Sequence, residues 1–133
     1  MLDTAICSLF NIRHPVIQGG MAHIGTAELV SAVSNSGGLG IIGCGFYEPD
    51  WVKDQIIMTR HLTDKSFGIN IQLASPFVTD VLSLVIEEKV RIVTTGAGNP
   101  KSYITRFHKA GIKVVPVVNR LTKTSRGRAT SHR

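Results

Sequence analysis

The stretch that decides the fold is Ile17-Gln18-Gly19-Gly20-Met21-Ala22, in which an apolar, strand-like run ends in paired glycines. Further strand-like runs follow at a period of about 25 residues, which suits a strand, a helix and two short loops. These runs are 39–43, 67–71, 90–95 and 112–118. In a βα repeat of this kind the chemistry is expected in the loops that follow the strands.

Helix signals fall between the predicted strands. Thr26 is a candidate N-cap for a helix to Asn35, which Gly37 and Gly38 then end, and Pro49 suits the first turn of a helix to about Arg60. The remaining helices are expected at 75–88 and 99–108, with a short one at 4–10 that would plug one end of a barrel. The predicted order is therefore β-α-β-α-β-α-β-α-β.

Crossovers between such strands are right-handed, so the five strands are expected to be parallel and covered by helices. Two α/β architectures fit this order. One is a complete, doubly wound sheet of the flavodoxin type, and the other is the first half of a TIM (β/α)8 barrel, which needs about 250 residues. A chain of 133 residues corresponds to one domain, which we place at 1–118.

The net charge of +6 is concentrated at the end of the chain. Residues 119–133 contain five Lys or Arg, no acidic residue and a single large apolar side chain, which is typical of a disordered or out-of-frame tail. The rest of the chain is nearly neutral, which disfavours nucleic acid as a partner, although a basic arm that contacts phosphates is an alternative.

Other classes of protein are disfavoured by composition. No apolar run approaches the roughly 20 residues that span a bilayer, and the N-terminus lacks the basic start of a signal peptide, so we expect a cytoplasmic protein without a membrane partner. Cys7 and Cys44 are expected to be buried free thiols, and no metal site is expected.

The pattern G-x-G-x-x-G occurs at 38–43, but here it follows a helix and lies inside a predicted strand, which disfavours a dinucleotide site. Gly19-Gly20-Met21 lies instead at the end of a strand. Missing side chains there permit either a flat ligand to approach the backbone or simply a tight turn, and spacing alone leaves both open.

Two amide side chains on the third predicted strand are candidate ligand contacts. Asn70 stands among apolar neighbours and needs a polar partner, and Gln72 points the same way by strand alternation. A ligand edge or neighbouring loops would satisfy them equally well. The run 94–100 again combines a strand end, small residues and a helix start. His23 is expected to be an exposed loop residue.

Four motifs together resemble a known family: Ile17-Gln-Gly-Gly-Met-Ala22, Gly37-Gly-Leu-Gly-Ile-Ile-Gly43, Phe67-Gly-Ile-Asn70 and Val93-Thr-Thr-Gly-Ala-Gly-Asn-Pro100. They are similar to the FMN-dependent group that holds nitronate monooxygenases, once called 2-nitropropane dioxygenases, and the flavin-type enoyl-acyl-carrier-protein reductase II. The resemblance runs from about residue 4 to Val118, and 75–78 and 107–111 lean towards the reductase branch.

The resemblance implies the half-barrel architecture and a set of cofactor contacts. By this resemblance Gly20, Met21 and Ala22 would contact the flavin ring through the backbone, and Asn70 would bond its polar edge. Gln72, Thr95 and Gly96 would line the same cavity. His23 departs from the bulky aromatic residue often found there in the reductases. The family's catalytic histidine, in a Gly-Gly-His context, is expected beyond residue 133.

The resemblance also implies chemistry: a hydride passes from NAD(P)H to FMN and then to an enoyl thioester, or an alkyl nitronate is oxidised with O₂. The family pattern ends where the basic tail begins, so we hypothesise a truncation, with a frameshift as its origin. The isolated chain is then expected to be inactive, to bind FMN weakly or not at all, and to self-associate through unpaired sheet edges. The alternative of another class is a non-catalytic, self-associating half-barrel.

Overall fold

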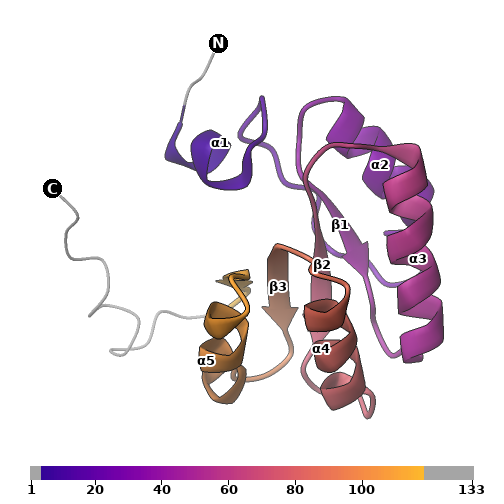
Figure 1. Ribbon diagram of the computed structural model, residues 1–133, viewed down its shortest axis with the longest axis vertical. Coiled ribbons are helices and arrows are strands. Elements are labelled where there is room, and N and C mark those ends of the chain that lie inside the picture. The colour runs from indigo at the N-terminus through magenta and orange to yellow at the C-terminus, as the bar shows by residue number, and fades with distance from the viewer. Residues whose placement is uncertain (1–3, 119–133) are drawn as a thin grey trace, which may run out of the picture.

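The computed structural model describes residues 4–118, so the predicted tail at 119–133 lies outside the described residues. Its helices are α1 (Ala5–Phe10), α2 (Ala27–Asn35), α3 (Pro49–Leu62), α4 (Val78–Glu87) and α5 (Lys101–Lys109), and its strands are β1 (Gly40–Gly43), β2 (Phe67–Gln72), β3 (Ile92–Gly96) and β4 (Lys113–Pro116). The strands form one parallel sheet in the order β1-β2-β3-β4 (Figure 1). The predicted α/β alternation is confirmed.

The first predicted strand is the exception, because Ile17 forms only an isolated parallel bridge to Leu39. Beyond it the side chain of Gln18 replaces the backbone ladder. Its Oε1 accepts from the Ile41 backbone nitrogen at 3.0 Å, and its Nε2 donates to the Ile41 carbonyl at 3.2 Å. The backbone at Gly19 is thereby released from the sheet edge, as the predicted strand end at the paired glycines requires. The predicted first strand itself is reduced to this one bridge, so the sheet of the described residues has four strands and not the five that were predicted.

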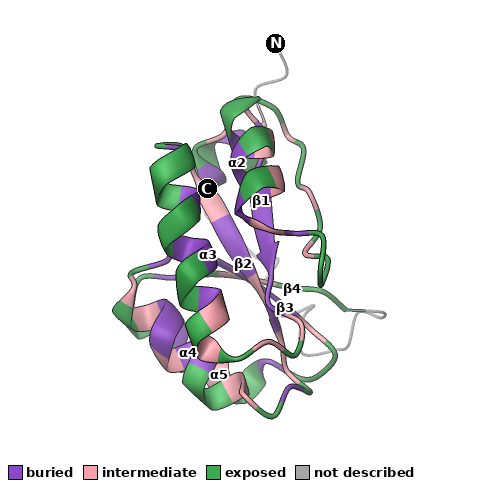
Figure 2. Cartoon of the chain, turned by 90° about the vertical axis from the view of Figure 1, so that its right-hand side faces the viewer, coloured by how far each residue is buried: buried purple, intermediate pink, exposed green. Residues whose placement is uncertain are grey.

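The main core lies between the sheet and the helices α2 to α5. Alternate strand residues point to this layer and meet the apolar stripes of the helices. The fully buried members include Ile42, Ile69, Ile71 and Val93 from the strands, and Val52, Ile56, Leu82, Val85 and Phe107 from the helices. Figure 2 shows the result, with purple strands and helices that are green on their outer side.

The opposite face of the sheet carries a second, smaller core. Ile41 and Ile92 on this face pack with Leu39 and with Phe10, which is 4% exposed on α1. Helix α1 lies apart from the other helices, near the amino ends of the strands (Figure 1). The short helix that the sequence predicts as a plug is therefore present, and its Phe10 packs on this second face of the sheet.

The glycines of the G-x-G-x-x-G pattern serve packing. A Cβ atom on Gly40 would lie 2.2 Å from the carbonyl oxygen of Val30 in α2, so the absence of a side chain lets α2 lie directly on β1. All four residues of β1 are buried. The pattern is part of the sheet, as its position in the sequence indicates.

The Gly40→Ala substitution is expected to lower the free energy of unfolding by about 3 kcal/mol, because the new methyl group meets helix backbone that only a shift of α2 can relieve. Urea unfolding followed by circular dichroism measures this. The matched control is Gly19→Ala, whose Cβ would have no atom within 4 Å. Equal unfolding midpoints for the two variants would contradict the close contact.

Burial raises the pKa of the Cys44 thiol to about 12, above its usual value near 9. A pKa raised in the folded state favours the neutral thiol, so this contribution to stability is complete below pH 9 and is lost between pH 9 and 12. We expect the free energy of unfolding to fall more steeply over this interval in the native chain than in a Cys44→Ala variant. Parallel curves for the two proteins would contradict it.

Candidate functional site

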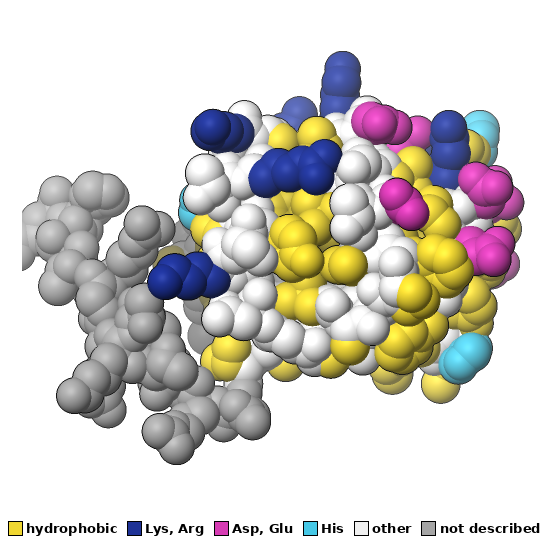
Figure 3. Space-filling model, turned by 90° about the horizontal axis from the view of Figure 1, so that it is seen from below, with side chains coloured by type: hydrophobic (Ala, Val, Ile, Leu, Met, Phe, Trp, Pro, Cys, Tyr) yellow, Lys and Arg dark blue, Asp and Glu magenta, His cyan; other side chains and the backbone are white. Residues whose placement is uncertain are grey.

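The carboxyl ends of the strands bring the candidate residues together. In the sheet register Gly43 pairs with Asn70, Asn70 pairs with Thr94, and Gln72 pairs with Gly96. Figure 3 views this edge from below, with apolar side chains gathered on the face and charged ones mostly at its margin. Residues that lie up to 53 positions apart in the chain thus share one small area.

The segment after Gln18 crosses this area at very short range. A Cβ on Gly20 would lie 2.2 Å from the Asn70 Cβ, and a Cβ on Gly43 would lie 2.3 Å from the Met21 carbonyl oxygen. Neither side chain could be added without moving backbone. The turn is closed by the backbone nitrogen of Gly25, which donates to the Met21 carbonyl at 2.7 Å. The glycines therefore let the backbone of this segment lie directly on β1 and β2.

Asn70 is the polar centre of the area. Its Nδ2 donates to Thr94 Oγ1 at 2.8 Å, and its side chain is half-buried. Among the described residues, Asn70 Oδ1 has no hydrogen-bond partner. One carboxamide edge, an acceptor with a second N–H beside it, is therefore left to pair with a ligand. Thr94 is a site residue that the residue-by-residue prediction missed, although its position opposite Asn70 follows once the strand register is known.

Thr95 does not belong to this face, and its predicted place in the cavity was wrong. It pairs with Ile71, whose side chain packs in the helix-facing core, and alternation turns both side chains to that layer. Thr95 is 1% exposed, and its Oγ1 has no hydrogen-bond partner among the residues described. A buried hydroxyl without a partner costs about 1–3 kcal/mol.

The other predicted contact residues differ in their exposure and in the neighbours on which they pack. Met21 is 41% exposed, and Ala22 packs against Gly45, where a Cβ would lie 2.9 Å from the Ala22 Cβ. Gln72 is half-buried, with its Oε1 3.8 Å from the position of a Cβ on Gly96. Gly20, Met21, Asn70 and Gly96 thus lie at one edge of the sheet, and their contact with a flavin stays a prediction.

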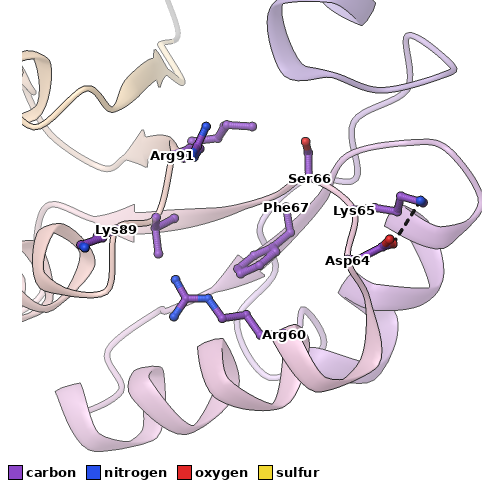
Figure 4. A pocket seen from close by; sticks show the side chains of 9 residues that line it. Arg60, Asp64, Lys65, Ser66, Phe67, Lys89 and Arg91 are labelled. Carbon is purple, nitrogen blue, oxygen red and sulfur yellow. Dashed lines mark ion pairs between the residues drawn. The ribbon is translucent and has the colours of Figure 1, made fainter.

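Two hollows of the surface lie at the opposite edge of the sheet. One of about 310 Å³, at the amino ends of β2 and β3, is lined by the basic residues Arg60, Lys65, Lys89 and Arg91. Figure 4 shows the Lys89 amine and the Lys65–Asp64 ion pair on opposite sides of the Phe67 ring. The Arg60 guanidinium is already held by Glu88 at 2.9 Å. These cations do not converge on one point, so the cavity is a poor anion site.

No three His, Cys, Asp or Glu side chains within residues 4–118 are grouped as a metal site. In the same part of the chain no helix is long and apolar enough to cross a membrane. The site is therefore described by backbone amides, two carboxamides and a threonine hydroxyl. Such groups hold and orient a polar, planar ligand, but they supply no strong acid, base or nucleophile.

In parallel α/β folds ligands bind at the carboxyl ends of the strands, the edge at which these residues lie. Comparison with known structures finds FabK from Thermotoga maritima, with a TM-score of 0.87 and 49% sequence identity over 89% of this chain and 38% of that protein. FabK is a TIM-barrel protein, so the four strands correspond to part of a barrel.

The chain belongs to the nitronate monooxygenase family, whose model matches residues 3–84. One relative is a 5-hydroxy-7a-methyl-1-oxo-octahydro-1H-indene-4-carboxyl-CoA dehydrogenase of Mycobacterium tuberculosis, 36% identical over 88% of this chain. Another is a probable nitronate monooxygenase of Staphylococcus saprophyticus, 34% identical over 92%. The chain spans 33% and 31% of the lengths of these two relatives.

The neighbours Thr94 and Thr95 provide a matched test of the two sheet faces. Thr95→Val removes an unpartnered hydroxyl and is expected to raise the free energy of unfolding by about 1 kcal/mol, whereas Thr94→Val removes the partner of Asn70 and is expected to lower it by about 1 kcal/mol. Urea unfolding of both variants measures the difference. A destabilised Thr95→Val protein with an unchanged Thr94→Val protein would reverse the assignment of faces.

Proposed function

We propose that this chain carries the ring-binding part of an FMN-dependent oxidoreductase of the enoyl-acyl-carrier-protein reductase II type. The observation that carries the proposal is the close approach of the Gly20 and Met21 backbone to Gly43 and Asn70, beside the Asn70 Oδ1, which has no hydrogen-bond partner within residues 4–118. These residues fit a flavin. A flat ring needs a surface without side chains, and its pyrimidine edge offers both a donor and acceptors to a carboxamide.

The residues of this chain would bind and orient the cofactor. The backbone of Gly20, Met21 and Ala22 would form the surface on which the flavin ring lies, which we call the seat. Asn70, fixed by Thr94, would set the orientation of the ring. Gln72 and Gly96 would close the side towards β3. When bound, FMN supplies hydride transfer, and NAD(P)H is the proposed electron donor.

The substrate class is proposed from the relatives. The 49% identity to FabK favours an enoyl thioester, and a relative named for a carboxyl-CoA also acts on a thioester. Oxidation of alkyl nitronates with O₂ is the second candidate, favoured by the family model and by a relative named as a nitronate monooxygenase. The proposal also includes a cytoplasmic location, and self-association of the chain stays a prediction.

Nuclear magnetic resonance of the ¹⁵N-labelled chain tests the site directly, because chemical-shift mapping detects weak binding. Saturable shifts are expected for the amides of Gly20, Met21, Ala22 and Gly96 and for the side-chain amide of Asn70 when FMN is added to millimolar concentration. Weak affinity is expected, because charge-assisted contacts to the FMN phosphate are worth about 1.5–3 kcal/mol each. In the family these contacts are expected from loops after later strands of the barrel, which have no counterpart among residues 4–118.

Gly20→Ala is expected to weaken this binding at least tenfold, since the added methyl group must displace Asn70 or the seat itself. Gly19→Ala, with free space at its Cβ, is the control and is expected to bind as the native chain does. Shifts confined to the amides around Arg60, Lys89 and Arg91 would place the ligand in the basic cavity and defeat the proposal.

A further inference from the structure

Three aromatic rings contact one another in sequence beside the proposed seat, two from consecutive loops, His23 and Tyr47, and one from α3, Trp51. His23 and Tyr47 meet edge to face, with ring centroids 5.3 Å apart and planes at 76°. Tyr47 and Trp51 stack, with centroids 3.9 Å apart and planes at 18°. The Tyr47 hydroxyl is also hydrogen-bonded to His23 Nδ1. Tyr47 and Trp51 are partly buried and pack on the main core, whereas His23 is exposed.

His23 has an unusual backbone. Its φ of 68° lies in the left-handed region, which costs a residue with a side chain roughly 1 kcal/mol or more. The conformation belongs to a tight turn in which the nitrogens of Ile24 and Gly25 donate to the Met21 carbonyl at 3.3 and 2.7 Å. Contacts elsewhere must offset this cost, and within residues 4–118 the His23 side chain makes a ring contact and a hydrogen bond with Tyr47.

The same turn is attached to β1 at its other end. Gly43 donates its backbone N–H to the Gly25 carbonyl at 3.0 Å, and the Tyr47 nitrogen donates to the Cys44 carbonyl at 2.9 Å. Gly45, with φ of 52°, turns the backbone next to Ala22. The segment 43–47 therefore holds the segment 20–25 at both sides, and Tyr47 supplies the side-chain half of this attachment.

We propose that Tyr47 is a positioning residue that acts through His23 to fix the backbone of residues 20–22 in the conformation that receives the flavin ring. The proposal rests on the proposed function. The stack with Trp51 holds the Tyr47 ring against α3. The Tyr47 hydroxyl, through its hydrogen bond to His23, then restricts the motion of the turn. Neither side chain is expected to take part in the chemistry. Their effect is to reduce the ordering that a ligand would otherwise have to impose.

The test compares Tyr47→Phe, which keeps the ring and removes the hydroxyl, with Tyr103→Phe, the same change at the other tyrosine of the chain, on α5. Hydrogen exchange of the Ile24 and Gly25 amides is measured without ligand, and FMN affinity is measured by chemical-shift titration. Trp51 fluorescence, from the sole tryptophan, reports whether the stack persists.

For Tyr47→Phe we expect amide exchange in the turn and the dissociation constant for FMN both to rise about threefold to tenfold, with a slightly lower urea midpoint from the loss of one hydrogen bond and an unchanged Trp51 spectrum. Tyr103→Phe should match the native chain. Native exchange rates in Tyr47→Phe, or faster exchange with unchanged FMN affinity, would overturn the proposal. A native chain that shows no saturable FMN shifts would instead defeat the proposed function.

A double-mutant cycle with His23→Ala separates positioning from a general loss of stability. If Tyr47 acts through His23, the two substitutions together should raise the FMN dissociation constant no more than the larger single effect. Additive effects would overturn the proposal. The cycle also stands if either single variant is less stable, since affinity is compared among proteins that are folded at the measuring temperature.

Discussion

The contact between the Gly20–Met21 backbone and the side chain of Asn70 is the constraint on which the site depends. Only a residue without a Cβ can lie at position 20, because that atom would meet Asn70 at 2.2 Å, and the same holds at Gly43 beneath Met21. The close approach lays the backbone of residues 20 and 21 on the carboxyl edge of the sheet, where it forms part of the surface. Asn70 and Thr94 then give that surface its polar direction.

The close approach depends in turn on how the chain leaves the sheet. Gln18 makes through its side chain the two hydrogen bonds to Ile41 that a continuing strand would make through its backbone. Residues 19–22 are therefore not paired in the sheet and can cross its second face, the one that points away from helices α2 to α5. The turn that follows is held by Gly43 and, through His23, by Tyr47. Fold and site are thus coupled through a few contacts around β1.

Much of this could be predicted from the sequence, because periodicity and capping residues fix the helices and four of the five strands. The reduction of the first strand to one bridge could not be predicted. In the sequence, a glutamine whose side chain replaces the backbone hydrogen bonds of a strand cannot be distinguished from any other polar strand residue. Asn70 was identifiable as an amide among apolar neighbours. Which face of the sheet Thr94 and Thr95 each point to could not be predicted, because that assignment needs the register of β3 against β2.

The most direct measurement of the central claim is the intermolecular nuclear Overhauser effect between FMN and the ¹³C,¹⁵N-labelled chain. We predict contacts from the flavin ring protons to the Met21 side chain and the Asn70 amide, at the carboxyl edge of the sheet. Contacts instead to Phe67 and Arg91, at the amino edge, would contradict the location of the seat and the function built on it.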